Sequence, residues 1–300
     1  MSQKRQRNLV QDNRTLAPRS TKTVVYRPES QIRRPRQLLW EMWRDLLASR
    51  ELAWRLLVRD ISAQYRQSFF GIIWAFLPPI VTALGFTLAR NNGVVNIGET
   101  NIPYPVYVMF SMALWQTFVE SLNGPIQAVN QAKPMLAKIN FPREAIILAK
   151  LGEVFFNFGI KTLLLIGMFI LFQVSVSWTV VIAPVALIHL VALGTSLGLF
   201  LAPMATLYQD FSRALLMITG FWLFLTPVVF PVPTSGLFGA VVRLNPVTPL
   251  LVTVRDLTTT GIVSDPAGFW AVSAIAFVGL FVAWILYRLS MPFVVERISS

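Results

Sequence analysis

Three polar residues, Glu153, Asn157 and Lys161, interrupt a largely apolar stretch of the chain at intervals of four residues. Residues at i, i+4 and i+8 lie on one face of an α-helix, so the spacing predicts a polar stripe. Ionisable residues inside a membrane normally face the interior of a helix bundle or a water-filled path. The stripe is therefore either the hydrated lining of such a path, or a Glu-to-Lys bridge or snorkelling side chains that only hold helices together. The sequence leaves the same two interpretations open for Glu120 and Asn123.

Few residues in this sequence are suited to bind a metal or to act in catalysis. The chain has no cysteine, which excludes disulfides and thiolate metal sites, and His189 is its single histidine. No acidic residue or second histidine is near it in the sequence, so we expect an interhelical hydrogen bond there rather than a proton relay or a metal ligand. The 14 acidic residues are scattered, without an Asp-x-Asp pair. We therefore expect no cofactor, no metal site and no catalytic residue.

Charged residues are distributed very unevenly along the chain. They are absent from 67–89, 162–209, 214–242 and 266–287, whereas the first 66 residues contain 15 of the 26 basic residues. A hydrocarbon layer ~30 Å thick takes about 20 apolar helical residues to cross, and a charge at its centre costs ~2.5 kcal/mol or more. With 55% hydrophobic residues, the sequence predicts an all-α integral membrane protein.

The long apolar stretches predict six transmembrane helices. They are expected near 69–89, 105–124, 145–172, 180–207, 214–230 and 266–287. Pro78 and Pro79 should kink the first of these or unwind a turn, and the amphipathic stretch 235–265 predicts one or two short external helices. Counted by side, 22 of the Lys and Arg residues fall inside and three outside, so both termini are expected in the cytoplasm.

Two segments precede the first expected span. Residues 1–35 are basic and contain few large apolar residues, which predicts a disordered cytoplasmic tail. Without interleaved aromatic residues, this tail does not indicate nucleic-acid binding. In 36–67, apolar residues recur at helical spacing between charged ones, which predicts an amphipathic helix lying among the lipid headgroups. The alternative is a soluble helical hairpin that packs on a partner. Residues 68–298 would then form the six-span domain.

Short strings of residues follow one another in a specific order. They are Arg59-Asp60-Ile61, Tyr65-Arg66-Gln67-Ser68, Gly71, Trp74, Pro78-Pro79, Lys138 with Phe141-Pro142-Arg143-Glu144, Tyr208-Gln209-Asp210, Thr226-Pro227-Val228 and Leu244-Asn245-Pro246. With these strings, the chain from about Gln37 to Ile298 resembles the permease subunit of ATP-driven exporters of O-antigen, capsular polysaccharide and teichoic acid. One departure is Gln209, inserted where many members have Tyr-Arg-Asp.

The resemblance implies a homodimeric channel that works with two copies of a cytoplasmic ATP-binding subunit. Such a channel moves a lipid-linked glycan outward across the cytoplasmic membrane of a bacterium. The sequence supports part of this independently, because it has no Gly-rich phosphate loop followed by Lys and Ser or Thr. We therefore expect a transporter subunit, not an enzyme, with ATP hydrolysis on the separate partner chain.

The resemblance also implies a loop that couples ATP hydrolysis to the spans. This loop would contain Lys138, Phe141, Pro142, Arg143 and Glu144. Pro134 is expected to open a short helix there and Pro142 to end it, so that the charged residues are presented to the cytoplasm. The alternative is an ordinary helix start with Glu144 in its first turn, where a carboxylate is favourable.

Aromatic residues at the start of the first span are candidates for the glycan path, together with the stripe of Glu153, Asn157 and Lys161. Phe70 and Trp74 are four residues apart, beside the proline pair. Aromatic rings can stack on the apolar C–H faces of sugars, and flat surfaces tolerate sliding. The alternative for these residues is the aromatic belt of any membrane interface.

Two other functions are compatible with a hydrophobic helix bundle. Export of a drug or a lipid needs the same composition, and the sequence does not separate these cargoes. A membrane-embedded glycosyl- or acyltransferase would need paired carboxylates, a metal site or an activated nucleophile, and the scattered acidic residues argue against it.

Overall fold

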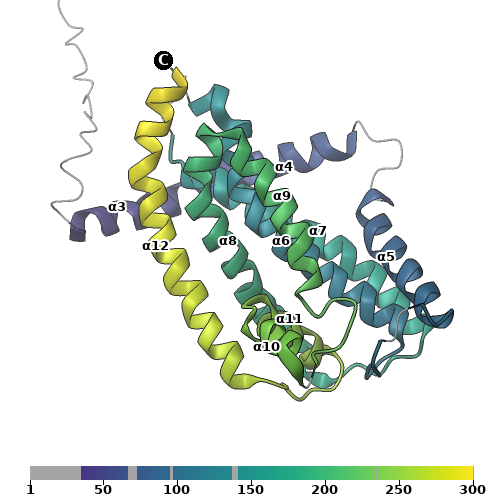
Figure 1. The fold of residues 1–300 in the computed structure, drawn as a ribbon. Helices are drawn as coiled ribbons and strands as arrows, with labels where there is room; N and C mark the ends of the chain where they lie inside the picture. Colours follow the sequence, from purple (N-terminus) through teal and green to yellow (C-terminus); the bar gives the residue numbers. More distant parts are fainter. Residues whose placement is uncertain (1–34, 67–72, 95–96, 137–140, 234, 300) are drawn as a thin grey trace, which may run out of the picture. The chain divides into compact units, whose positions relative to one another are not determined.

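A computed structural model describes residues 35–66, 73–94, 97–136, 141–233 and 235–299 of the chain. The chain divides into two units, Met1–Leu39 and Trp40–Ser300, and the packing below is that of the second. Every long element among the described residues is a helix (Figure 1), which confirms the predicted all-α class. Residues 1–34 lie outside the described part, and the prediction of a basic tail there stays a prediction.

The helices have the following bounds. They are α3 (Pro35–Ala48), α4 (Arg50–Arg66), α5 (Ile73–Asn91), α6 (Tyr104–Leu136), α7 (Glu144–Leu171), the 3₁₀ helix η1 (Trp178–Val181), α8 (Ala183–Leu207), α9 (Gln209–Phe224), α10 (Gly236–Leu244), α11 (Val247–Thr258) and α12 (Pro266–Ser299).

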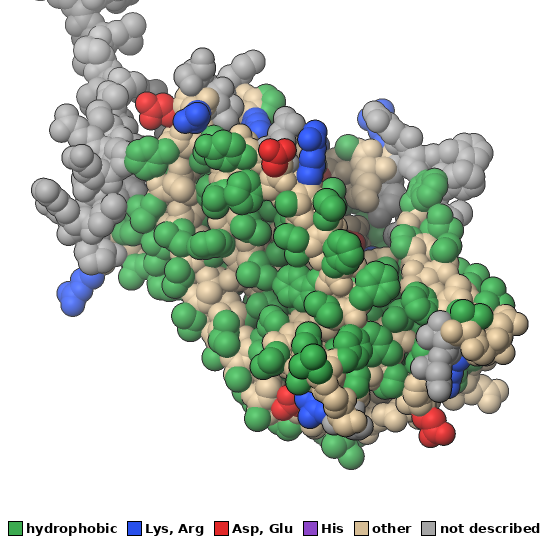
Figure 2. All heavy atoms as spheres, in the orientation of Figure 1, with side chains coloured by type: hydrophobic (Ala, Val, Ile, Leu, Met, Phe, Trp, Pro, Cys, Tyr) green, Lys and Arg blue, Asp and Glu red, His purple; other side chains and the backbone are tan. Residues whose placement is uncertain are grey.

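Three of these helices, α7, α8 and α12, are long and apolar enough to cross a membrane. The short helices α10 and α11, which meet at 84°, add a fourth crossing if the bent pair counts as one span. They occupy the stretch for which the sequence predicts short helices. Figure 2 shows hydrophobic side chains over the middle of one face, with charged side chains near its two ends, the distribution expected of a membrane protein.

Helix α8 packs against α6, α11 and α12 and is the most deeply buried of the three candidate spans. Its sequence is apolar all round, which is typical of a largely buried helix, and the side chains that stay exposed include Val185 and Phe200. Small residues let α6 approach closely: a Cβ at Gly194 would collide with Ser121 Oγ, and a Cβ at Gly198 would collide with Leu122 O. This Gly-xxx-Gly pair therefore fixes the α6–α8 contact.

Replacing Gly198 with leucine is expected to destabilise the bundle by about 2 kcal/mol or more, because the side chain would meet the backbone of α6, which cannot yield easily. The measurement is thermal unfolding of the purified protein in detergent. Gly159→Leu on α7 is the matched control, since a Cβ there meets open space. Equal stability of the two variants would contradict the assigned role of Gly198.

Several prolines lie within continuous helices, at positions where the sequence predicts a kink, an unwound turn or the start of a new helix. Helix α6 continues through Pro125 and Pro134 to Leu136, well beyond the predicted end of span 2 near Gly124, and the predicted short helix opening at Pro134 is wrong. Helix α5 likewise runs without a break through Pro78 and Pro79. Neighbouring helices support such prolines: Pro125, for example, lies against Gly198 of α8.

Helix α9 ends at Phe224, earlier than the predicted end near Phe230. The residue before a proline avoids helical backbone angles, so Pro227 accounts for the early end. The predicted helix over 36–67 is in the structure two helices that meet at Ser49. Backbone hydrogen bonds continue through Ser49, while its hydroxyl donates to Asp45 O at 2.6 Å, a bond that often bends a helix.

Candidate functional site

The polar stripe on α7 is completed by a carboxylate from α6. Lys161 Nζ lies 2.5 Å from Glu120 Oε1, and Asn157 Nδ2 donates to Glu120 Oε2 at 3.4 Å. Lys161 is buried, whereas about a third of the Glu120 side chain is exposed. A buried ammonium needs a nearby counter-charge, and the Glu120 carboxylate supplies one for Lys161.

Glu153, the third residue of the stripe, pairs elsewhere. Its Oε2 lies 2.7 Å from Lys150 Nζ, three residues earlier on the same helix, and both side chains are largely buried. Of these two ion pairs, Glu120–Lys161 joins α6 to α7, whereas Lys150–Glu153 lies within α7 and joins no two helices. Asn123 donates only to Val119 O of its own helix, so it does not join either bridge.

One polar atom of the stripe is left without a partner. Among the described residues, the side-chain oxygen of Asn157 is buried and accepts no hydrogen bond. An unsatisfied buried acceptor costs about 1–3 kcal/mol unless water or a ligand reaches it. The arrangement of Glu120, Asn157 and Lys161 thus combines a structural ion pair with one free acceptor, which is compatible with both interpretations of the stripe.

The predicted coupling loop is only partly described. Lys138 lies outside the described residues, while Phe141, Pro142 and Arg143 are half-buried. Phe141 packs against the apolar cluster formed by α4, the ends of α6 and α12 and the start of α7. Glu144 is buried, so the expectation that its carboxylate is presented to the cytoplasm is wrong.

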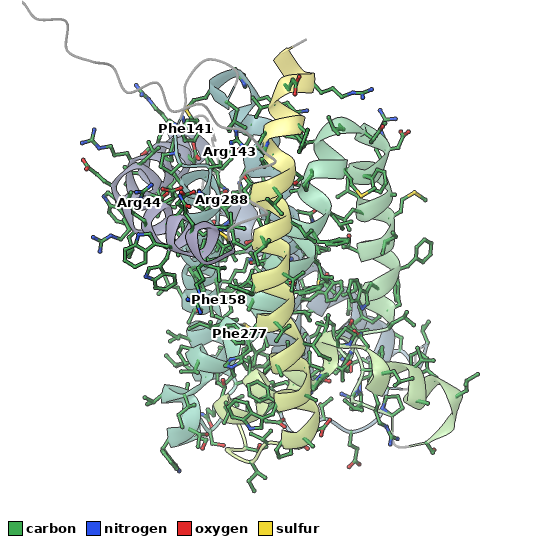
Figure 3. The ribbon with its side chains drawn as sticks, turned by 90° about the vertical axis from the view of Figure 1, so that its left-hand side faces the viewer. Arg44, Phe141, Arg143, Phe158, Phe277 and Arg288 are labelled. Carbon is green, nitrogen blue, oxygen red and sulfur yellow. The ribbon has the colours of Figure 1, made fainter. Side chains whose placement is uncertain are left out.

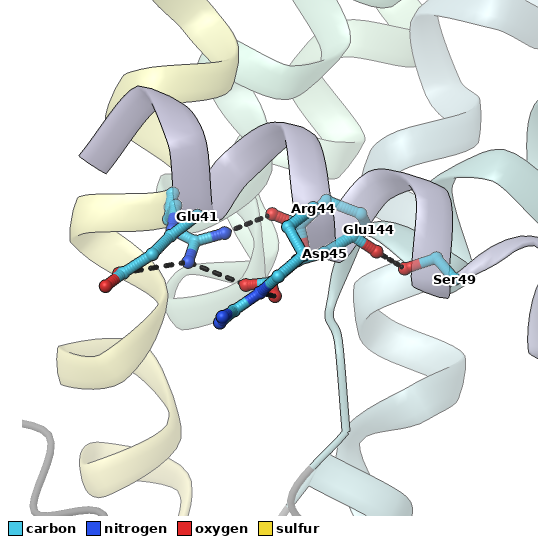
Figure 4. A network of polar contacts seen from close by, with 6 residues as sticks. Glu41, Arg44, Asp45, Ser49 and Glu144 are labelled. Carbon is cyan, nitrogen blue, oxygen red and sulfur yellow. Dashed lines mark hydrogen bonds and ion pairs between the residues drawn. The ribbon is translucent and has the colours of Figure 1, made fainter. Parts of the chain in front are cut away.

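Glu144 is buried and pairs with Arg288 of α12. Figure 3 shows Arg288 at the same end of the bundle as Phe141 and Arg143. Arg288 Nη1 donates to Glu144 Oε1 at 2.9 Å, and Nη2 donates to Asp45 Oδ2 of α3 at 2.7 Å (Figure 4). Glu41 adds a third carboxylate at 3.9 Å. The planar guanidinium presents its donors as a fork, so one side chain ties α3, α7 and α12 together.

This Arg288 cluster, formed by Arg288, Glu41, Asp45 and Glu144, holds three carboxylates around one guanidinium. Arg44 lies 3.8 Å from Asp45 and adds a second, exposed positive charge. The Arg288 side chain is only 10% exposed, so water screens these charges weakly and their positions depend on one another. In the sequence, Arg288 directly follows the neutral run 266–287, and that position predicts none of its partners.

The remaining predicted site residues lie apart from this cluster. Phe70 is outside the described residues. Trp74, at the start of α5, is 58% exposed. His189 Nδ1 bonds to Val185 O of its own helix at 2.7 Å and packs among aromatic rings of α12, so the expected interhelical hydrogen bond is wrong. Within the described part of the chain, no group of His, Cys, Asp or Glu side chains is arranged to hold a metal.

At the opposite end of the bundle, Asn245 joins two of the strings noted in the sequence. Its Nδ2 donates to Thr226 Oγ1 at 2.9 Å and to Leu225 O at 3.0 Å. Its Oδ1 accepts from Trp222 Nε1 and from Val247 N. The Leu244-Asn245-Pro246 and Thr226-Pro227-Val228 strings therefore form one hydrogen-bonded corner between α9 and α11.

Comparison with protein families finds the ABC-2 type transporter model over residues 51–258, more than two thirds of the chain. The chain belongs to this family. The matched region begins in α4 and ends with α11, so it includes the Asn245 corner, the stripe on α7 and Glu144, whereas Asp45 and Arg288 lie outside it.

Curated relatives of this ABC-2 transporter carry a more specific name. An O-antigen export system permease protein RfbA from Myxococcus xanthus is 24% identical over 247 residues, covering 80% of this chain and 92% of the relative. A protein of the same name from Klebsiella pneumoniae is 19% identical over 212 residues, covering 69% and 79%. The predicted resemblance to permeases of polysaccharide exporters is confirmed at the level of the family.

Proposed function

We propose that this chain is the permease subunit of an ATP-driven exporter that moves a lipid-linked polysaccharide, such as O-antigen or a capsule, across the cytoplasmic membrane. The observation that carries the proposal is the ABC-2 family match, together with two relatives named as O-antigen export permeases. The energy source would be a separate ATP-binding chain, because this sequence contains no phosphate-binding loop.

The proposed topology has six spans, formed by α5, α6, α7, α8, α9 and α12, with both termini in the cytoplasm. At ~1.5 Å per residue, the 19 residues of α5 extend about 28 Å, close to the thickness of the hydrocarbon layer. The α9 helix is shorter, and the turn after it would complete that crossing. The basic excess before α5 and around α7 supports the cytoplasmic side for those ends.

The segment 36–67 is proposed to lie at the lipid headgroups. Helices α3 and α4 expose three tryptophans, Trp40, Trp43 and Trp54, each more than half accessible. Tryptophan prefers the boundary between headgroups and acyl chains, and the neighbouring arginines suit anionic lipid. Residues 1–35 would precede it as a cytoplasmic tail, and 68–298 would form the permease domain.

The proposed assembly is a homodimer with two ATP-binding subunits. Helix α5 exposes a row of apolar side chains at spacings of three and four residues: Trp74, Leu77, Val81, Leu84 and Leu88. This is the spacing at which two helices pack along a seam. A second copy of the chain fits this row, and Phe70 and Trp74 would then lie near the path between the copies.

Within each subunit, the loop from Lys138 to Glu144 is proposed to receive motion from the ATP-binding chain. Its last residue is held by Arg288, so movement of the loop would reach α12 and α3 directly. The stripe of Glu153, Asn157 and Lys161, with Glu120, is proposed to hydrate the glycan path. The unsatisfied oxygen of Asn157 supports this role.

Copurification tests the proposal. The tagged chain, solubilised in mild detergent from its own bacterium, is expected to bring down a nucleotide-hydrolysing partner, while the chain alone hydrolyses no ATP. Recovery of the chain without any ATPase, or steady hydrolysis by the isolated chain, would contradict the assignment.

The six-span topology predicts which residues are accessible from outside the cell. Because the chain contains no cysteine, single introduced cysteines can be labelled without background. Asn92→Cys and Gln173→Cys should react with a membrane-impermeant maleimide in intact cells, whereas Gln131→Cys and Arg213→Cys should react only after lysis. Labelling of Arg213→Cys in intact cells would refute the six-span arrangement.

A further inference from the structure

A cavity of about 350 Å³ lies at the end of the bundle that carries α10, α11 and the start of α12. Its walls come from the loop before α6, the loop before α10, helix α11 and the residues just before α12. Small-molecule sites in proteins start near this volume. Neither the proposed path nor the Arg288 cluster uses this cavity.

The inner wall of the cavity is rigid. Arg255 is buried, with its guanidinium 4.2 Å from the centre of the Tyr107 ring and Nη1 donating to Ser111 Oγ at 3.0 Å. Next to it, Asp256 Oδ2 accepts from both the backbone N and the hydroxyl of Ser264, at 2.8 and 2.6 Å. These charged groups are satisfied within the protein, so they shape the site and need no ligand.

Three other lining groups are available to a ligand: the Thr248 hydroxyl, which is buried, and the exposed side chains of Glu99 and Asn101. Among the described residues, the Thr248 hydroxyl is buried and has no hydrogen-bond partner. The Glu99 carboxylate and the Asn101 amide line the same cavity, and no hydrogen bond or ion pair to another described residue is found for either side chain. Together they offer acceptors on Glu99, a donor and an acceptor on Asn101, and a hydroxyl that can do either.

Apolar surface completes the lining. Pro231, Pro249 and Val252 contribute carbon surface beside the polar groups. A ligand that fits must therefore be small, rich in hydroxyl groups on its edge and apolar on one face. A pyranose ring has this chemistry. A divalent cation does not fit, because within the described residues no set of carboxylates converges on one point and Arg255 lines the site.

We propose that this cavity binds one sugar unit of a glycan, through Glu99, Asn101 and Thr248 on the polar edge and the proline-rich wall on the apolar face. The inference rests on the proposed export function and adds a specific saccharide contact on the outer side of the membrane. Binding there must be weak, because an exporter has to release the glycan that it moves.

Saturation-transfer NMR on the purified full-length chain in lipid nanodiscs tests the site. The probes are free galactose, glucose, mannose, N-acetylglucosamine and rhamnose, with glycerol as a hydroxyl-rich control that lacks a ring. At least one pyranose is expected to receive magnetisation and glycerol none. Glu99→Ala and Thr248→Val should each weaken that binding about tenfold, as expected for losing one hydrogen bond to a ligand.

Two comparisons separate binding from folding. Thr248→Val keeps the side-chain shape and removes no bond within the protein, so the unfolding temperature should not fall. Asn92→Ala is the matched control, since its amide bonds only Leu88 O and is outside the cavity lining; it should leave sugar binding unchanged.

The proposal is wrong if no pyranose in the panel binds, if glycerol binds equally well, or if the Glu99 and Thr248 variants bind as the unaltered chain does. These outcomes are distinct from failure of the export proposal, which is judged by copurification of an ATPase and does not involve Glu99 or Thr248.

Discussion

Replacing Arg288 with methionine is expected to be the most damaging single change in the chain, lowering the free energy of unfolding by about 4 kcal/mol. The reason is that Glu41, Asp45 and Glu144 would be left close together, largely buried, and without their shared positive charge. Breaking a buried pair by removing one partner typically costs ~3–5 kcal/mol. Thermal unfolding in detergent measures the loss.

The control for this variant is Arg213→Met. Arg213 is 77% exposed and lies 3.9 Å from Asp210, which is 95% exposed, so its loss should change stability by less than about 1 kcal/mol. Arg288→Lys should fall between the two, because an ammonium keeps the charge but lacks the fork that reaches Glu144 and Asp45 at once. If Arg288→Met unfolded at the same temperature as Arg213→Met, the Arg288 cluster would not stabilise the fold.

A second large loss of stability is expected at the Glu120–Lys161 pair, and its size should depend on which of the two residues is replaced. Glu120→Gln leaves the Lys161 ammonium buried without a counter-charge and should cost about 3 kcal/mol. Lys161→Met leaves a Glu120 carboxylate that is about one third exposed and can remain hydrated, so it should cost only about 1 kcal/mol. Unfolding of both variants in detergent gives the two values.

The double variant completes the test of this pair. Since each single change removes the same contact, Glu120→Gln with Lys161→Met should be less destabilising than the sum of the two, by about 1 kcal/mol or more. Additive effects, or a larger cost for Lys161→Met than for Glu120→Gln, would show that the short contact does not stabilise the helix pair.

The sequence predicts the fold class well because membrane solvation is a strong and local constraint. Long uncharged runs mark α8 and most of α12 directly, and the run 162–209 also includes the C-terminal part of α7. Helix ends at prolines are predicted less well, since the cost of a proline inside a helix depends on neighbours such as Gly198 beside Pro125, which are distant in the chain.

The candidate site was predictable only in part, for a related reason. The spacing of Glu153, Asn157 and Lys161 shows that they share a helical face, but it does not show that Lys161 pairs with Glu120 of α6. Likewise, Asp45 and Arg288 are 243 residues apart, and nothing local in the sequence indicates that they touch. Partners across helices require the packed structure.

The central claim of this account is that the chain moves a lipid-linked polysaccharide outward. The most direct measurement is the side of the cytoplasmic membrane on which that glycan is found when the chain is deleted from its bacterium. The account predicts that lipid-linked polysaccharide accumulates on the cytoplasmic face and disappears from the cell surface, with both effects reversed by a plasmid copy. Normal surface polysaccharide in the deletion strain would contradict it.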